Sequence, residues 1–194
     1  QELGDEVLDS TYEKVFMGKN AGRVWVHAHH GVNNLEDIFS KLRYMIIGLD
    51  CRWMVVDHLH MFVLATLESD ERKAIDGIMH RLRTMVEETG CGMILVSHLR
   101  RIDGNRGHEN GIETGLNHLR GSQSIAQLSD CVISLERNQQ SEDELEASTT
   151  KVRVLKSRYT GDVGVATQLM YDSETGRLRE LGEYDESQFE RDII

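Results

Sequence analysis

The sequence predicts an α/β fold: a mostly parallel central sheet flanked by helices in a three-layer α/β/α arrangement, with added antiparallel strands at one edge. Two apolar runs, WMVVD (53–57) and CGMILVSH (91–98), are typical of strands buried on both faces, and an amphipathic helix separates them. This strand–helix–strand order favours parallel pairing through a crossover. Three strand-like runs joined by short turns follow at 130–137, 151–157 and 164–172.

The elements before the first buried strand are predicted from periodicity. Residues 1–17 read as the end of a helix, and RVWVHAH (23–29) alternates like a strand. Apolar side chains then recur at helical spacing from Leu35 to Ile46. They predict a helix that leads into the strand at 53–57.

The longest helix is predicted between the two apolar runs. Ser69 can cap it, Asp70 and Glu71 suit its positive end, and Gly90 ends it. Its apolar stripe consists of Ile75, Ile78, Met79, Leu82, Met85 and Val86. In the second half we expect a short helix near 121–128, and the acidic segment 141–150 is most simply a solvated hairpin tip.

Composition limits the class of protein. The 194 residues are 39% hydrophobic, which suits one globular domain, and no run is long and apolar enough to span a membrane. The three cysteines, Cys51, Cys91 and Cys131, are odd in number and widely spaced, so we expect reduced core thiols. The net charge of −11 argues against nucleic acid, but two acidic segments, 141–150 and 172–194, carry most of it. A local basic surface is therefore compatible with the composition.

Two polar side chains are predicted to lie together at one edge of the sheet. Asp57 ends the first apolar run and His98 ends the second, and open α/β sheets bind ligands at the carboxyl ends of their strands. An aspartate there can hold Mg²⁺ through water, and a polar group on the adjacent strand can contact a terminal phosphate.

The loop after His98 is basic and rich in glycine. It contains Arg100, Arg101, Arg106 and Arg120, and it is too polar for the core. A plain surface loop and a mobile loop that contacts a phosphate backbone are both compatible with this composition. In the second case His98, at the root of the loop, would couple nucleotide state to loop position.

The run HLRGSQSIAQLSDCVISLERNQQ (118–140) closely resembles the helicase part of the podophage (T-odd type) bifunctional primase–helicases. VVDH, SDERKAIDGIMHRL and LKSRYTGDVG extend the resemblance over about residues 35–180. It is weaker to other Twinkle-like and DnaB-like replicative ring helicases. The resemblance implies a RecA-like motor over residues 1–180 that works as a homo-hexamer, hydrolyses ATP or dTTP with Mg²⁺, and moves 5′–3′ along single-stranded DNA.

The resemblance also implies roles for individual residues. Asp57 corresponds to the Walker B aspartate, His98 to the γ-phosphate sensor, and Gln127 to a glutamine near the nucleotide. Arg158 resembles the arginine finger that enters the neighbouring subunit's site. The residues that would flank the base are Arg137 and Tyr171, and those that would contact DNA are Arg100, Arg101, Arg106, Arg120 and Gly121.

Two departures from the family stand beside these matches. A phosphate-binding loop GxxxxGK[ST] is missing: around Gly18-Lys19, Glu13 replaces the first glycine and Asn20 the hydroxyl residue. In the family that loop, the catalytic glutamate and the primase half precede the region matched here. We therefore expect an N-terminally truncated fragment that does not hydrolyse ATP by itself.

Two other classes of function remain open from the sequence. A non-catalytic RecA-like DNA-binding or scaffold protein would lack the phosphate loop naturally. A metal-dependent hydrolase could use a cluster of imidazole and carboxylate ligands formed by His27, His29, Asp57, His58, His60 and His98.

The acidic tail, 181–194, reads as disordered. Related phage proteins dock the replicative DNA polymerase with such a tail, and the resemblance here is partial because Phe189 is not terminal. The expected location is the cytoplasm of a phage-infected cell rather than a mitochondrion, with no membrane association.

Overall fold

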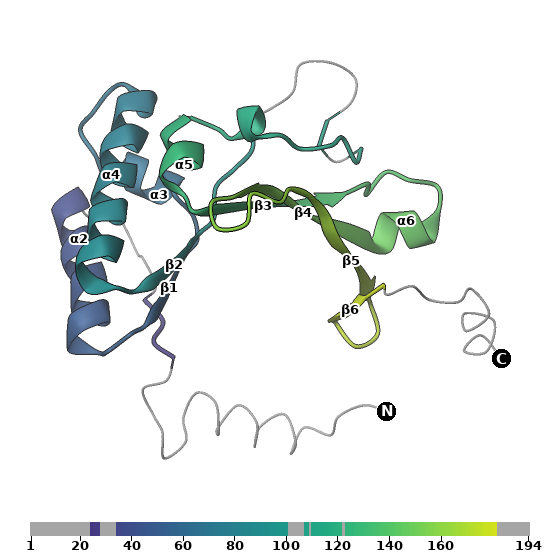
Figure 1. Cartoon of the computed structure of the whole chain (residues 1–194), viewed down its shortest axis with the longest axis horizontal. Coiled ribbons are helices and arrows are strands. Elements are labelled where there is room, and N and C mark those ends of the chain that lie inside the picture. The colour runs from purple at the N-terminus through teal and green to yellow at the C-terminus, as the bar shows by residue number, and fades with distance from the viewer. Residues whose placement is uncertain (1–23, 28–33, 101–106, 109, 122, 182–194) are drawn as a thin grey trace, which may run out of the picture. The chain divides into compact units, whose positions relative to one another are not determined.

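The computed structural model describes residues 24–27, 34–100, 107–108, 110–121 and 123–181 (Figure 1). The chain divides into two compact units, of which unit 1 contains 1–98 and 120–128, and unit 2 contains 99–119 and 129–194. The helix expected in 1–17 lies outside the described residues. Of the strand expected at 23–29, residues 24–27 are described, and they have no regular secondary structure.

Unit 1 contains the α/β part of the fold. Its elements in chain order are α2 (Leu35–Arg43), a π-helical turn (Tyr44–Gly48), β1 (Trp53–Val56), α3 (His60–Leu64), α4 (Glu71–Thr89), β2 (Gly92–Leu95) and α5 (Gln123–Leu128). None of the helices among the described residues is long and apolar enough to cross a membrane.

The long helix α4 forms as its sequence predicts, apart from its first residue. Asp70, not Ser69, is the N-cap, because its carboxylate accepts hydrogen bonds from the backbone N–H groups of Arg72 and Lys73. Gly90 ends the helix in the left-handed conformation, with φ +70°. The predicted stripe is buried at Ile75, Ile78, Met79, Leu82 and Met85, and Val86 is half-buried.

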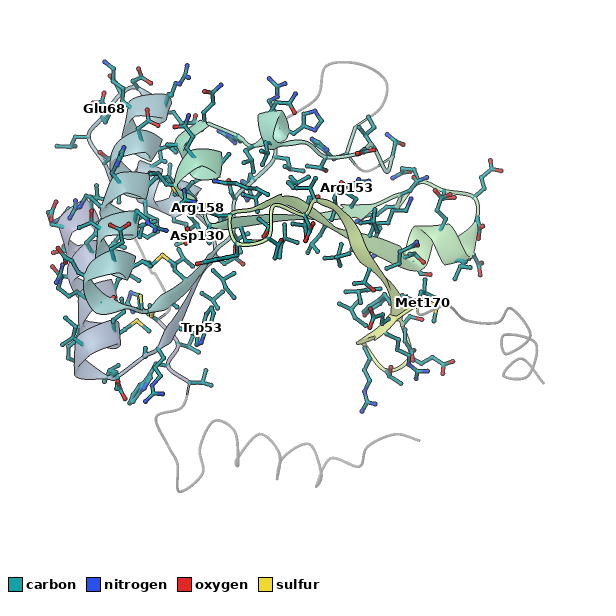
Figure 2. All side chains as sticks on the ribbon, viewed as in Figure 1. Trp53, Glu68, Asp130, Arg153, Arg158 and Met170 are labelled. Carbon is teal, nitrogen blue, oxygen red and sulfur yellow. The ribbon has the colours of Figure 1, made fainter. Side chains whose placement is uncertain are left out.

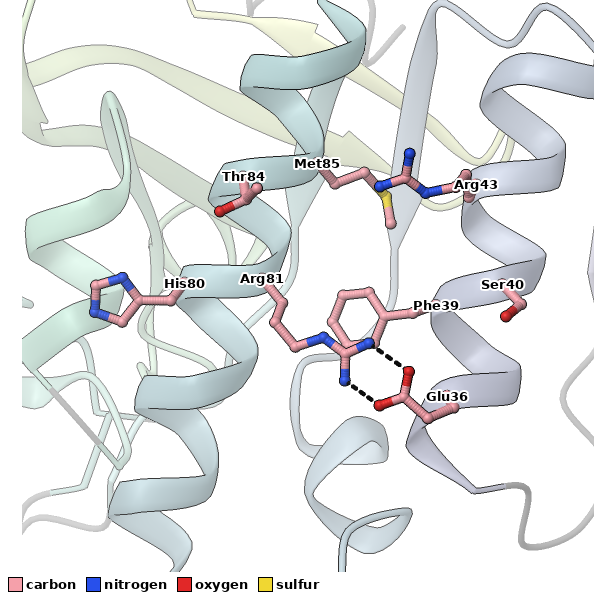
Figure 3. A pocket seen from close by; sticks show the side chains of 8 residues that line it. All are labelled: Glu36, Phe39, Ser40, Arg43, His80, Arg81, Thr84 and Met85. Atoms are coloured by element: carbon pink, nitrogen blue, oxygen red, sulfur yellow. Dashed lines mark hydrogen bonds and ion pairs between the residues drawn. The ribbon is translucent and has the colours of Figure 1, made fainter.

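Helices α2 and α4 are joined at their surface by charged side chains (Figure 3). The Arg81 guanidinium donates two hydrogen bonds, of 2.7 and 2.8 Å, to the Glu36 carboxylate and lies 3.8 Å from the centre of the Phe39 ring. Arg43 pairs with Glu88 at 2.7 Å. A shallow pocket of about 340 Å³ lies between the two helices, and its lining contains no residue from the strand ends. We therefore interpret it as part of the helix packing.

The β1–β2 sheet has one covered face and one open face. Met54 of β1 is buried, as are Phe39 and Leu42 of α2 on the helical side. On the other face Trp53 is 70% exposed, and Val55 and Ile94 are also exposed (Figure 2). The sequence predicts that β1 and β2 are buried on both faces. This expectation is wrong for the described residues, because the helices cover only one face of the sheet.

Unit 2 is built on a four-stranded antiparallel sheet in the order β3-β4-β5-β6. Its strands are β3 (Cys131–Arg137), β4 (Thr149–Ser157), β5 (Gly164–Asp172) and β6 (Arg177–Glu180). The first three match the predicted runs, and β6 was not predicted. Together with the parallel pair of unit 1, this sheet confirms the α/β class with parallel and antiparallel strands.

Two other expectations in unit 2 need correction. The acidic segment 141–150 is not a plain hairpin tip, because Asp143 caps a short helix, α6 (Glu144–Ser148), between β3 and β4. Cys131 is exposed, since it lies on the outward face of β3, whereas Cys91 in unit 1 is buried as expected and Cys51 is half-buried.

Candidate functional site

The ends of β1 and β2 bring Asp57 and His98 to the same edge of a sheet. The strands are parallel, with Val56 opposite Leu95, and the Val96 N–H continues the ladder by donating to the Val56 carbonyl at 2.9 Å. Asp57 follows β1 directly and His98 lies three residues beyond β2, and both side chains are exposed. The predicted pair is therefore accessible at the carboxyl edge, where α/β sheets bind ligands.

His98 also lies close to two other imidazoles, and we call His58, His60 and His98 the histidine cluster. Their potential metal-binding nitrogens all lie within 4.8 Å of one another. The His58 and His98 ring centres are 4.1 Å apart, and the His60 and His98 rings are stacked at 5.2 Å. The Leu59 N–H donates to the Val96 carbonyl at 2.9 Å, so the turn into α3 places His60 against the end of the neighbouring strand. Of the other proposed ligands, His27 is exposed, and His29 lies outside the described residues.

His60 is the buried member of the cluster. Only 8% of its surface is exposed, and neither ring nitrogen has a hydrogen-bond partner among the described residues. Burial, together with the nearby positive charge of Arg120, lowers the pKa of His60 below its ordinary value, although Glu71 opposes the shift. The Glu71 carboxylate lies 3.6 Å from His60 Nε2, beyond hydrogen-bond distance.

The segment that re-enters unit 1 is anchored next to His98. The Arg120 N–H donates to the His98 carbonyl at 3.0 Å, and Arg120 Nε donates to the Glu71 carboxylate at 3.1 Å. Gly121 has φ +109°, and a Cβ atom there would collide with Ile75 Cδ1 of α4. The backbone conformation therefore favours glycine at this position, and the close approach of Ile75 adds to that preference.

Of the other residues predicted in the basic loop and in α5, the structure describes Arg100 and Gln127. The Arg100 N–H donates to the His118 carbonyl at 2.8 Å, and the Arg100 side chain is exposed. Arg101 and Arg106 lie outside the described residues. Gln127 is exposed on α5, in the same unit as Asp57 and His98.

Arg158 lies at the end of β4 in unit 2, beside Asp130 (Figure 2). Its guanidinium donates to the Asp130 carboxylate at 3.0 Å, and its N–H donates to the Asp130 carbonyl at 2.8 Å. The Arg158 side chain is 47% exposed, so it can be reached from solvent. Sequence reasoning missed Asp130, because 28 positions separate the two residues.

Arg137 and Tyr171 lie on one face of the unit 2 sheet. Arg137 is opposite Thr150, and Thr150 is opposite Leu169, two residues before Tyr171. Paired residues share a face and alternate residues share a face, so Arg137 and Tyr171 lie on the same side of the sheet. Two strand spacings and an offset of two residues along β5 separate them by roughly 12 Å. Arg137 Nε donates to the Ala147 carbonyl at 2.6 Å, which fixes part of its guanidinium.

A buried carboxylate ties the loop before β3 to this sheet. Glu136 is 6% exposed and accepts hydrogen bonds from the Thr114 N–H at 2.8 Å, Arg153 Nε at 3.0 Å and Ser134 Oγ at 3.1 Å. Arg153 also pairs with Glu113 at 3.0 Å. Burial raises the pKa of Glu136, but the hydrogen bonds outweigh it and leave the pKa below its ordinary value. Sequence reasoning missed this network.

Comparisons with known proteins give consistent results. Residues 11–180 match the family described as DnaB-like helicase C terminal domain. The chain is similar to the DNA helicase/primase of Enterobacteria phage T3, with 41% identity over 143 residues, 74% of this chain and 25% of that protein. It is also similar in structure to a KaiC-like protein, PH0186, from Pyrococcus horikoshii OT3, with a TM-score of 0.57 and 13% identity over 90% of this chain and 64% of that one. The structural likeness supports the expected RecA-like fold.

Proposed function

Because the chain belongs to the DnaB-like helicase C-terminal domain family, we propose that it is the motor part of a replicative DNA helicase. It spans a quarter of the length of the phage T3 relative, so the activity of a whole protein is an extension from this part. In this proposal residues 1–180 form one RecA-like motor domain, and 181–194 form an acidic tail. The family match over 11–180 supports that boundary.

The observation that carries the proposal is the position of Asp57 and His98 after two paired parallel strands, at the same edge of the sheet. Asp57 is an exposed carboxylate, the type of oxygen ligand that Mg²⁺ prefers, and it would hold that ion through water. When bound, Mg²⁺ would neutralise charge on the phosphates of ATP or dTTP. His98 would contact the terminal phosphate, and Gln127 of the same unit would lie near the nucleotide.

Unit 2 would supply the groups that reach the base and a neighbouring subunit. Arg137 and Tyr171, on one face of the sheet, would flank the base by stacking. Arg158 would leave Asp130 and enter the site of the next subunit, where its charge would stabilise the transition state. The half-exposed position of the Arg158 side chain supports this role, since a neighbouring subunit can reach it from solvent.

Single-stranded DNA is the proposed track. Arg100, Arg101, Arg106, Arg120 and the Gly121 backbone would contact phosphates rather than bases, so binding would weaken with salt and depend little on sequence. Six copies would form a ring around the strand and move 5′–3′ along it. Arg120 would have to exchange its contact with Glu71 for a DNA phosphate.

The tail and the location complete the proposal. The acidic tail, 181–194, would dock a replicative DNA polymerase through its negative charge. The likeness to a phage T3 protein supports a role in the cytoplasm of an infected cell.

Replacing Arg158 with alanine in the full-length protein tests the proposal. We expect DNA-stimulated NTP hydrolysis to fall about a thousandfold or more, with nucleotide binding largely retained. Arg177→Ala, at an exposed position on β6 of the same unit, is the matched control and should hydrolyse at the normal rate. Near-normal hydrolysis by Arg158→Ala would contradict the assignment.

A further inference from the structure

The histidine cluster has the geometry of a transition-metal site that the proposed motor does not need. We propose that His58, His60 and His98 bind one Zn²⁺-class ion through their imidazole nitrogens at the edge of the β1–β2 sheet. This site differs from the Mg²⁺ position at Asp57 because imidazole nitrogens suit zinc, copper, nickel and cobalt, whereas Mg²⁺ prefers oxygen.

The nitrogen–nitrogen distances in the cluster can be compared with those of a zinc site. Three nitrogens bound to zinc at about 2.0–2.1 Å in tetrahedral geometry lie about 3.3 Å from one another. In the cluster they lie within 4.8 Å of one another, and the His60 and His98 rings are nearly parallel, so the rings must turn until their nitrogens face one point before an ion can bind. The backbone already holds the three residues together, because the Leu59 N–H and the Arg120 N–H bond to the backbone of Val96 and His98.

His60 is the residue whose state calls for a ligand. It is buried, and both of its ring nitrogens lack a hydrogen-bond partner among the described residues, which is a costly state for a polar group. Nδ1 of His58 is in the same condition. A bound ion would use one nitrogen of each ring and would leave the other free to donate a hydrogen bond.

The charged side chains around the cluster can accommodate a cation if Glu71 shifts slightly. Glu71 Oε1 lies 3.6 Å from His60 Nε2 and can accept its N–H after a small shift, in the manner of the carboxylates that orient metal-binding histidines. Arg120 would repel a cation, and its pairing with Glu71 reduces this repulsion without removing it. One position of the metal would thus be left to water, with three protein ligands as in catalytic zinc sites. We infer no hydrolytic step.

Occupancy would have a consequence that rests on the proposed function. An ion held by His98 withdraws that imidazole from the terminal phosphate. Zn²⁺ would then inhibit NTP hydrolysis by the full-length protein over the concentration range in which it binds the cluster.

Titration of the 194-residue chain with Co²⁺ and Zn²⁺ tests the site without nucleotide or DNA, so its failure leaves the motor proposal intact. We expect stoichiometric binding and the intense visible absorption of Co²⁺ in a site of low coordination number. His60→Ala and His98→Ala should each weaken binding by more than about tenfold, and Glu71→Gln by about tenfold. His80→Ala, at an exposed position on α4, should bind as the parent chain does.

Three results would overturn the inference. They are a weak octahedral Co²⁺ spectrum in the parent chain, equal binding by the His60→Ala and parent chains, and an equal loss in His80→Ala. Circular dichroism of each variant shows whether it is folded, and His60→Gln replaces His60→Ala if the smaller side chain unfolds the chain. Stoichiometric Zn²⁺ binding without inhibition would uphold the site and overturn its consequence for hydrolysis.

Discussion

Replacing Glu136 with glutamine should destabilise unit 2 far more than an equal change on its surface. The Glu136 carboxylate accepts hydrogen bonds from Thr114, Ser134 and Arg153 while its side chain is only 4% exposed. Glutamine has nearly the same shape but no charge, so the three donors would face a neutral acceptor. Arg153 would keep its contact with Glu113.

The size of the effect follows from these bonds. Hydrogen bonds to a charged acceptor contribute about 1.5–3 kcal/mol and neutral ones about 0.5–1.5 kcal/mol, so each of the three loses about 1 kcal/mol. The expected loss in the free energy of unfolding is about 3 kcal/mol. Because the folded-state pKa of Glu136 is lowered, its stabilisation is full above the ordinary value of 4.5 and is lost as pH falls through the lower folded value. The difference between the parent chain and the variant should therefore shrink below pH 4.5.

Urea unfolding followed by circular dichroism, with hydrogen exchange at the Thr114 amide, measures this effect. Exchange is needed because both tryptophans, Trp25 and Trp53, belong to unit 1, so their fluorescence does not report on unit 2. Glu142→Gln, at an exposed position, makes the same chemical change and should alter stability by less than about 0.5 kcal/mol. A loss below about 1 kcal/mol for Glu136→Gln, or no faster exchange at Thr114, would refute the reasoning.

Two further predictions concern unit 1. Gly90→Ala should lower the free energy of unfolding by about 1 kcal/mol, because only the left-handed backbone opposes it. Gly121→Ala adds a clash with Ile75 and should lower it by about 2–3 kcal/mol more. Equal thermal shifts for the two variants would contradict the close approach of Gly121 to Ile75. Arg81→Ala should lower the melting temperature by removing the contacts to Glu36 and Phe39, and the difference should narrow at high salt because the ion pair is exposed; a salt-independent difference would assign the effect to packing alone.

The parts of the fold predicted well are those specified by local sequence. Helix α4 was predicted because an apolar stripe, an acidic start and Gly90 all agree. Its N-cap was misplaced by one residue because Ser69 and Asp70 are both good capping residues, and the choice depends on backbone geometry. Helix α6 was missed because a short acidic segment has no apolar stripe, and its cap, Asp143, reads equally well as a turn residue.

The candidate site likewise contains features that the sequence predicts and features that it does not. The position of Asp57 and His98 at one edge of the sheet was predictable, because neighbouring parallel strands place their carboxyl ends together. The stacking of His60 on His98 was not predictable, because it depends on how the turn into α3 follows β1. The contact of Arg158 with Asp130 depends on the pairing register of β3 and β4, which sequence patterns specify only loosely. The roles of these residues in catalysis stay predictions.

The Arg120 N–H donates to the His98 carbonyl, so the chain leaves unit 1 before residue 99 and returns to the same point after residue 119. The part of this stretch before Glu113 can therefore change in length while the framework around the strand ends keeps its geometry, whereas Glu113 and Thr114 are held by Arg153 and Glu136. An engineer who wants to graft a new binding peptide onto the domain has a natural insertion point.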